Sequence, residues 1–141
     1  MKIAALLTCF NRKEKTIQCL HSLFHILPEC NVYLVDDLST DGTSEAIQKS
    51  FPKVRIIKGT GSLFWSRGMY TAWKEAMRKN YDYFLWLNDD IELYPFFFQE
   101  LMECQALYNS NFKQCRRISL FGRLVVEIPV IIANRQIFEI R

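Results

Sequence analysis

The sequence predicts an α/β protein with a Rossmann-like, mostly parallel sheet that carries helices on both faces. Strand-like apolar runs alternate with amphipathic helical patterns through about residue 107. Three of the four runs are apolar throughout, as expected for parallel strands buried on both faces. With 141 residues, 50 % of them hydrophobic, the chain is long enough to form one domain with a substantial core.

Each expected strand is a short apolar run that ends in polar or turn-forming residues. The strands predicted from these runs are residues 3–8, 32–35, 54–57 and 81–87. Polar residues follow each run directly, and the carboxyl ends of parallel strands are where α/β sheets bind ligands. We therefore expect these polar residues to converge on one edge of the sheet.

Helices are expected between the strands because apolar residues recur there at three- and four-residue spacing. The first helix is predicted over residues 12–27, with Asn11 as a candidate cap and Pro28 at its end. The others are predicted over residues 43–50, over about four turns after residue 62, and from Pro95 onward.

The last quarter of the sequence follows this alternation less clearly. Two strands are expected there, over residues 118–121 and 124–132. Proline cannot donate a hydrogen bond to a neighbouring strand, so Pro129 should split the second strand or confine it to a sheet edge.

Composition excludes several classes of protein. The net charge is only +3 and the basic residues are dispersed, which argues against nucleic acid as a partner. Five cysteines without a CxxC pair suit a reducing compartment, and none is a good candidate nucleophile. No segment approaches the ~18–20 apolar residues of a transmembrane segment. We expect a cytoplasmic protein, peripheral to the inner membrane if it works at one.

Two adjacent carboxylates, Asp89 and Asp90, follow the aromatic run at 81–87. Such neighbours repel each other unless a positive group lies between them, and a divalent cation with oxygen ligands is the usual solution. The alternative is that Asp89 caps the next helix while Asp90 is solvated. Asp36 and Asp37 form a second adjacent pair, after the strand at 32–35.

Several familiar site signatures are absent. The first strand–helix turn, residues 8–11, has no glycine, and no GxxxxGK[ST] motif occurs, so the common phosphate-binding loops are excluded. His21 and His25 lie on the first predicted helix and are interpreted as surface or boundary residues. A serine–histidine hydrolase is therefore not favoured.

Four motifs in order resemble those of family-2 glycosyltransferases with the GT-A fold. They are Thr8-Cys9-Phe10-Asn11-Arg12, Val35-Asp36-Asp37-Leu38-Ser39-Thr40-Asp41-Gly42-Thr43, Gly61-Ser62-Leu63-Phe64-Trp65-Ser66-Arg67-Gly68-Met69 and Leu87-Asn88-Asp89-Asp90. The third is similar to the rhamnosyltransferase subgroup. The resemblance implies one GT-A-like domain over 1–141, with a nucleotide-sugar-binding part at 1–110 and a divergent or truncated tail at 111–141.

The resemblance also implies roles for individual residues at the donor site. Thr8 and Phe10 would line the base and ribose pocket, and Asp37 would accept a hydrogen bond from a uracil or thymine N–H. Arg67 would lie near the diphosphate or base. Asp90 would bind Mg²⁺ or Mn²⁺, and Asp89 would contact the ribose or the metal's water shell.

Two further expectations concern the scaffold around that site. Asp36 and Asp41 are expected to be structural, Asp41 as a helix cap. Trp65 is expected either to pack against the sugar or base or to lie in the core.

The implied reaction is metal-dependent, inverting transfer of a sugar from a UDP- or dTDP-sugar to an acceptor hydroxyl. The partners would be the nucleotide-diphosphate sugar and a saccharide or lipid-linked acceptor in polysaccharide assembly. The general base cannot be identified among the carboxylates after Asp90.

Two alternatives remain at this point: a non-catalytic nucleotide-binding remnant of such an enzyme, and a metal-dependent phosphoryl-transfer domain. An exposed apolar surface that includes Phe96 to Phe98 would favour a homodimer.

Overall fold

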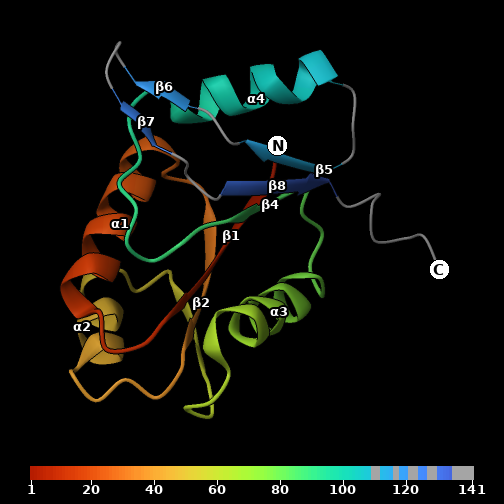
Figure 1. Cartoon of the computed structure of the whole chain (residues 1–141). Coiled ribbons are helices and arrows are strands. Elements are labelled where there is room, and N and C mark those ends of the chain that lie inside the picture. Colours follow the sequence, from red (N-terminus) through yellow and green to blue (C-terminus); the bar gives the residue numbers. More distant parts are fainter. Residues whose placement is uncertain (109–111, 116–117, 121–123, 127–129, 135–141) are drawn as a thin grey trace.

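The computed structural model describes residues 1–108, 112–115, 118–120, 124–126 and 130–134. Helices and strands alternate through the first three quarters of the chain, as predicted (Figure 1). In order they are β1 Ile3–Cys9, α1 Lys13–Ile26, β2 Asn31–Asp36, α2 Thr43–Ser50, β3 Arg55–Lys58, α3 Phe64–Ala76, β4 Tyr83–Trp86 and α4 Phe97–Tyr108. The strands β5 Phe112–Cys115, β6 Ile118–Leu120, β7 Leu124–Val126 and β8 Val130–Asn134 follow.

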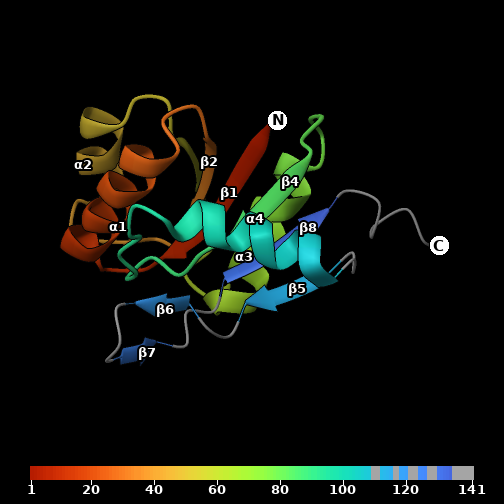
Figure 2. The ribbon, with the colours of Figure 1, turned by 90° about the horizontal axis from the view of Figure 1, so that it is seen from above.

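The main sheet has the strand order β3-β2-β1-β4-β8-β5. Strands β1 to β4 are parallel to one another, with Ala5 of β1 opposite Val32 of β2 and Leu85 of β4. Strand β8 pairs antiparallel with both β4 and β5. The predicted α/β fold with a mostly parallel sheet is thus confirmed (Figure 2).

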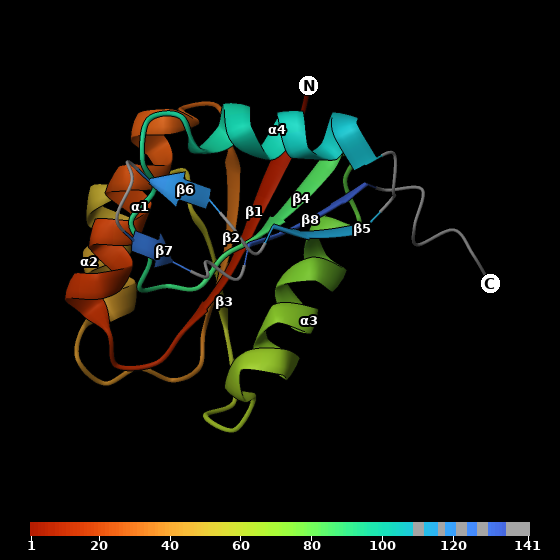
Figure 3. The same ribbon diagram turned by 45° about the horizontal axis from the view of Figure 1, so that its top comes forward.

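Helices cover both faces of the sheet because side chains alternate along the buried strands. From β1, Ile3, Ala5 and Leu7 face the helices α1, α2 and α4. Ala4 and Leu6 face α3, which buries Met69, Ala72 and Ala76 against them. Figure 1 shows α1 and α2 on one side of the sheet and α3 on the other, and Figure 3 shows α4 crossing over the strands.

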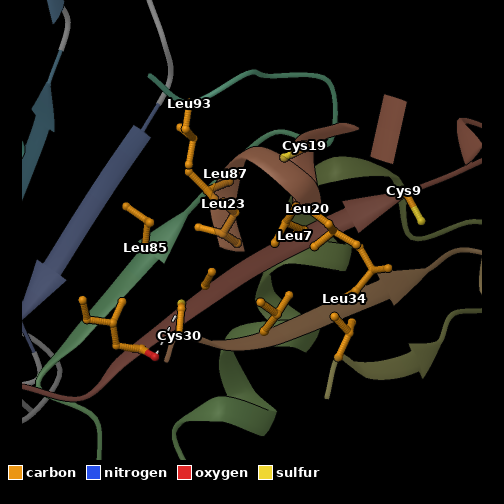
Figure 4. Packing of buried hydrophobic residues seen from close by; sticks show 14 of the residues in the cluster. Leu7, Cys9, Cys19, Leu20, Leu23, Cys30, Leu34, Leu85, Leu87 and Leu93 are labelled. Carbon is orange, nitrogen blue, oxygen red and sulfur yellow. Dashed lines mark hydrogen bonds between the residues drawn. The ribbon is translucent and has the colours of Figure 1, made fainter. Parts of the chain in front are cut away.

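The larger core cluster lies between the sheet and α1. Leu7, Leu20, Leu23 and Leu34 are fully buried there, and Figure 4 shows them packed against one another. Burial of one such leucine side chain contributes roughly 1.5–3 kcal/mol, so this face supplies much of the stability that holds the strand ends in place.

The C-terminal quarter differs from the expectation in its detail. The region expected as one strand over 124–132 contains two described strands, β7 and β8, and Pro129 itself lies outside the described residues. Strand β8, however, lies inside the sheet between β4 and β5 and not at its edge. Strands β6 and β7 form a separate antiparallel pair.

The apolar surface expected at residues 96–98 can be checked directly. Phe96 is 62 % exposed, but Phe97 is only 2 % exposed because it packs into the core, so the expected apolar surface at 96–98 is wrong for that residue. Among the described residues, none of the helices combines the length and apolarity needed to cross a membrane.

Candidate active site

A pocket of about 180 Å³ opens where the carboxyl ends of β1, β2 and β4 meet the start of α3. Four residues predicted from the sequence line it together: Thr8, Phe10, Asp37 and Asp89. The remaining lining residues are Cys9, Arg12, Phe64 and Trp65. The expected convergence of polar strand ends on one edge of the sheet is therefore confirmed.

The other two predicted site residues do not line this pocket. Asp90 lies beside it and lines a neighbouring groove of about 790 Å³ between α1 and residues 90–95. Arg67 is exposed and donates a hydrogen bond from Nη2 to the backbone carbonyl of Ser62, so it braces the loop that precedes α3. A contact between Arg67 and the donor stays a prediction.

Asp37 is buried and holds the loop at 59–64 in place. Its Oδ1 accepts a hydrogen bond from the Gly61 N–H at 2.7 Å, and its Oδ2 accepts from Leu63 at 2.8 Å and Phe64 at 3.2 Å. The loop approaches so closely that a Cβ on Gly59 would lie 2.9 Å from the Asp37 Cα. A carboxylate accepts about four hydrogen bonds, so these three leave room for one more.

Asp36 and Asp41 are scaffold residues, as the sequence predicted. Asp36 accepts hydrogen bonds from the Ser39 N–H and the Ser44 hydroxyl. Asp41 accepts from the first amides of two helices: from the Lys13 N–H of α1 at 3.0 Å and from the Thr43 N–H of α2 at 3.1 Å. Hydrogen bonding from Thr43 lowers the pKa of Asp41 below its usual value.

Asn11 does not cap α1, contrary to the sequence prediction. Its backbone is left-handed, with φ of 50°, and its Oδ1 accepts a hydrogen bond from the Thr40 N–H at 2.7 Å. Its own N–H donates to the Ser39 hydroxyl at 2.9 Å. Asn11 thus ties the end of β1 to the loop after β2, and Asp41 supplies the cap in its place.

Sequence reasoning missed Arg12, which lies between the two carboxylates after β4. Its Nη1 is 3.1 Å from Asp89 Oδ1 and its Nη2 is 2.9 Å from Asp90 Oδ2. Burial raises the pKa of Asp89 above its usual value, and the charge of Arg12 offsets only part of that rise. Arg12 follows β1, whose carboxyl end lies at the same edge of the sheet as that of β4. A search for charged residues of both signs after each strand could therefore have identified it.

The donor atoms of Asp89 and Asp90 suit a hard divalent cation. Mg²⁺ is commonly held by one or two carboxylates, with substrate phosphates and water as the other ligands. In the described part of the chain no cluster of three or more acidic, histidine or cysteine side chains could hold a metal ion. The two carboxylates therefore supply only part of a coordination shell.

Aromatic side chains surround the mouth of the pocket. Phe10 is 54 % exposed and Phe64 is 76 % exposed, although both are large and apolar. Trp65 is also exposed, and its indole N–H donates to Asn88 Oδ1 at 3.0 Å, so it lies at the site and not in the core. Exposed rings of this kind offer flat surfaces for stacking a base or a sugar.

Backbone strain is also concentrated at this edge of the sheet. Asn11, Leu38 and Phe64 have positive φ values of 50°, 63° and 53°. Asn11 and Leu38 lie in the loops after β1 and β2, and Phe64 is the first residue of α3. Such conformations are costly for residues other than glycine, and they gather at sites where the surrounding structure holds the backbone in place.

The buried thiols have no evident part in chemistry here. Burial raises the pKa of Cys9, Cys19 and Cys30 to about 12. A thiol with so high a pKa is protonated near neutral pH and is a poor nucleophile. The prediction that these three cysteines are not nucleophiles is consistent with their burial.

Comparisons with known proteins agree with the sequence motifs and the fold. Residues 5–113 match the family model described as glycosyl transferase family 2. A search of curated proteins finds no match.

Among solved structures, the chain is similar to the crystal structure of TarS 1-349 from S. aureus, with a TM-score of 0.70 and 18 % identity over 95 % of this chain. A structure of the same protein in complex with UDP-GlcNAc has a TM-score of 0.67 and 21 % identity over 89 % of this chain, or 37 % of that one. The mannosyltransferase PcManGT from Pyrobaculum calidifontis, in complex with GDP-Man and Mn²⁺, has a TM-score of 0.76 and 13 % identity over 98 % of this chain. The chain spans 47 % of TarS 1-349 and 46 % of PcManGT, so it is about half the length of these structures.

Proposed function

The chain belongs to glycosyl transferase family 2, and from this premise we propose that it transfers a sugar from a nucleotide-diphosphate sugar to an acceptor hydroxyl. The observation that carries the proposal is the pocket that brings Thr8, Phe10, Asp37 and Asp89 together at the carboxyl edge of the sheet. TarS and PcManGT are known with nucleotide sugars bound, and both share this fold.

We assign the base and ribose to the part of the pocket formed by Thr8, Phe10 and Asp37. Phe10 offers an exposed ring for the base. Asp37 has acceptor capacity for one N–H beyond its three bonds to the loop, which suits the ring N–H of uracil or thymine. We therefore propose a UDP- or dTDP-sugar as the donor, and we propose that the enzyme is of the rhamnosyltransferase-like subgroup that its third motif resembles.

Asp89 and Asp90 would hold Mg²⁺ or Mn²⁺, which when bound would neutralise charge on the departing diphosphate. Asp89 is fixed by burial and by Arg12, whereas Asp90 is more exposed. Arg67 would lie near the diphosphate or the base, where a guanidinium can bind pairs of oxygen atoms. We propose that the transfer inverts the configuration at the anomeric carbon. The proposed acceptor is a saccharide or a lipid-linked saccharide in polysaccharide assembly, and the proposed location is the cytoplasm or the inner membrane.

Calorimetric titration of UDP, dTDP and GDP, each with and without Mn²⁺, tests the donor site. Metal-dependent binding of UDP or dTDP should weaken at least tenfold in Asp90→Ala. The matched control is Asp82→Ala, which removes a carboxylate at the opposite end of β4, where it accepts from the Lys2 N–H. Binding to none of the three nucleotides would overturn the proposal.

A further inference from the structure

The two carboxylates after β4 already have a cationic partner in the protein itself. Among the described residues, the salt bridges to Asp89 and Asp90 both come from Arg12, through two different guanidinium nitrogens. The guanidinium therefore spans the two side chains that a divalent cation would share. Arg12 and a divalent cation therefore compete for the same two carboxylates.

The backbone at Arg12 is fixed while its side chain is accessible. The preceding residue, Asn11, is tied to Ser39 and Thr40, and the Arg12 carbonyl accepts from the Thr16 N–H at 2.9 Å and from its hydroxyl at 2.9 Å. The Arg12 side chain is nevertheless 48 % exposed, whereas that of Asp89 is only 7 % exposed. Any change of partner must therefore come from movement of the guanidinium, not of Asp89.

A diphosphate would offer that guanidinium a second partner in the same pocket. Arg12 lines the pocket that also contains Thr8, Phe10 and Asp37. Guanidinium groups bind pairs of phosphate oxygens in the same bidentate manner as carboxylates. A donor bound there could therefore draw Arg12 away from Asp89 and Asp90.

We propose that Arg12 is an exchangeable counter-cation that couples the binding of a nucleoside diphosphate to that of a divalent cation. Without nucleotide, Arg12 pairs with Asp89 and Asp90 and competes with the cation. With nucleotide, Arg12 pairs with the diphosphate and both carboxylates become available. The inference rests on the proposed function, and it makes Arg12 a residue that binds the donor diphosphate directly.

The test is Mn²⁺ binding followed by electron paramagnetic resonance, first without nucleotide. Arg12→Ala removes the competing charge, so we expect Mn²⁺ to bind about tenfold more tightly than to the wild type. Arg78→Ala is the matched control, because it removes an equal charge from a surface pair with Glu75 far from the site. A merely structural clamp predicts the opposite sign, since its removal would loosen the two carboxylates and weaken Mn²⁺ binding.

The second arm measures the coupling itself. In the wild type, saturating UDP should tighten Mn²⁺ binding to the protein, after correction for Mn²⁺ bound by free UDP. In Arg12→Ala this gain should shrink severalfold, and metal-free UDP should bind about tenfold more weakly. Uridine, which has no phosphate, should bind both proteins equally.

Two outcomes separate the inference from the proposed function. Equal Mn²⁺ affinity in the wild type and Arg12→Ala, with UDP still bound, overturns the inference alone. No binding of nucleotide by the wild type overturns the proposed function and the coupling together. If Arg12→Ala does not fold by circular dichroism, Arg12→Lys replaces it. Lysine keeps the charge but cannot span both carboxylates, so its Mn²⁺ affinity should lie above that of the wild type, and an unchanged value overturns the inference.

Discussion

The two pairs of adjacent aspartates are alike in sequence but differ in what surrounds them. Asp36 and Asp37 accept hydrogen bonds from backbone amides and from a serine hydroxyl, and both are buried. Asp89 and Asp90 are instead bridged by the half-exposed side chain of Arg12. Hydrogen bonds from backbone amides hold a loop in one conformation. A long, half-exposed side chain such as that of Arg12 can instead move to another partner. The first pair therefore holds loops in place and leaves only one acceptor position of Asp37 toward the pocket, whereas the second pair is suited to an exchange of partners.

Removal of Asp37 should produce the largest loss of stability. Asp37→Ala leaves three backbone N–H groups of the loop at 59–64 without their acceptor. Hydrogen bonds to charged groups contribute ~1.5–3 kcal/mol each and are not additive, so we expect a loss of about 3–5 kcal/mol. Urea unfolding followed by circular dichroism measures it. Asp90→Ala, which breaks an exposed ion pair, should cost less than about 1 kcal/mol; equal losses would contradict the distinction between the pairs.

A methyl group on Gly59 should disturb the same carboxylate by steric contact. Its Cβ would lie 2.5 Å from Asp37 Oδ1, so Gly59→Ala should cost about 2–3 kcal/mol in urea unfolding. Gly42→Ala is the comparison, because φ is +78° there but nothing lies within 4 Å, and we expect a conformational cost of about 1 kcal/mol. Combined with Asp37→Ala, the cost of Gly59→Ala should fall, since part of the clash is with that side chain. Full additivity would count against the contact.

Of the three main substitutions, Asp41→Ala should have the smallest effect, and that effect should depend on pH. Asp41→Ala removes the acceptor shared by the first amides of α1 and α2, at a cost of about 1–2 kcal/mol at pH 7. The folded-state pKa of Asp41 is lowered by its hydrogen bond from Thr43. The contribution is therefore fully present above the unfolded pKa of about 3.9 and is lost as pH falls through the lower folded value.

The measurement for Asp41 is the difference in unfolding free energy between the wild type and Asp41→Ala at pH 7, 5 and 3. Glu45→Ala is the control, because Glu45 is exposed in the first turn of α2 and tests the helix dipole without a capping bond. A difference for Asp41→Ala that grows as the pH falls would refute the assigned cap.

The fold and half of the site lining could be predicted from the sequence, because both depend on local patterns. Apolar runs fixed β1 to β4 to within a few residues, and the rule for strand ends placed Thr8, Asp37 and Asp89 at one pocket. The partner of each polar group could not be predicted in the same way. Arg12 lies 77 residues from Asp89 and Asp41 lies 28 residues from Lys13, so their pairing depends on how whole elements pack.

The position of β8 was also beyond local patterns. Its five residues read as an apolar strand wherever they pair, and only tertiary packing decides between an edge and an interior place. Asn11 shows the same limit on a smaller scale. Its residue type suits a helix cap, but its side chain instead bonds to the Thr40 N–H of the neighbouring loop.

The order of strands has a consequence for synthesis of the chain. Strand β4 ends at Trp86, whereas its partner β8 begins at Val130. At about 5–20 residues per second, β8 would leave the ribosome roughly 2–9 seconds after β4. During that interval β1 to β4 can already form their parallel sheet, but the outer edge of β4 has no partner strand from β8. A nascent chain with such an edge is open to capture by chaperones or by another unfinished copy, so slower translation between these strands would increase aggregation without any change in the finished protein.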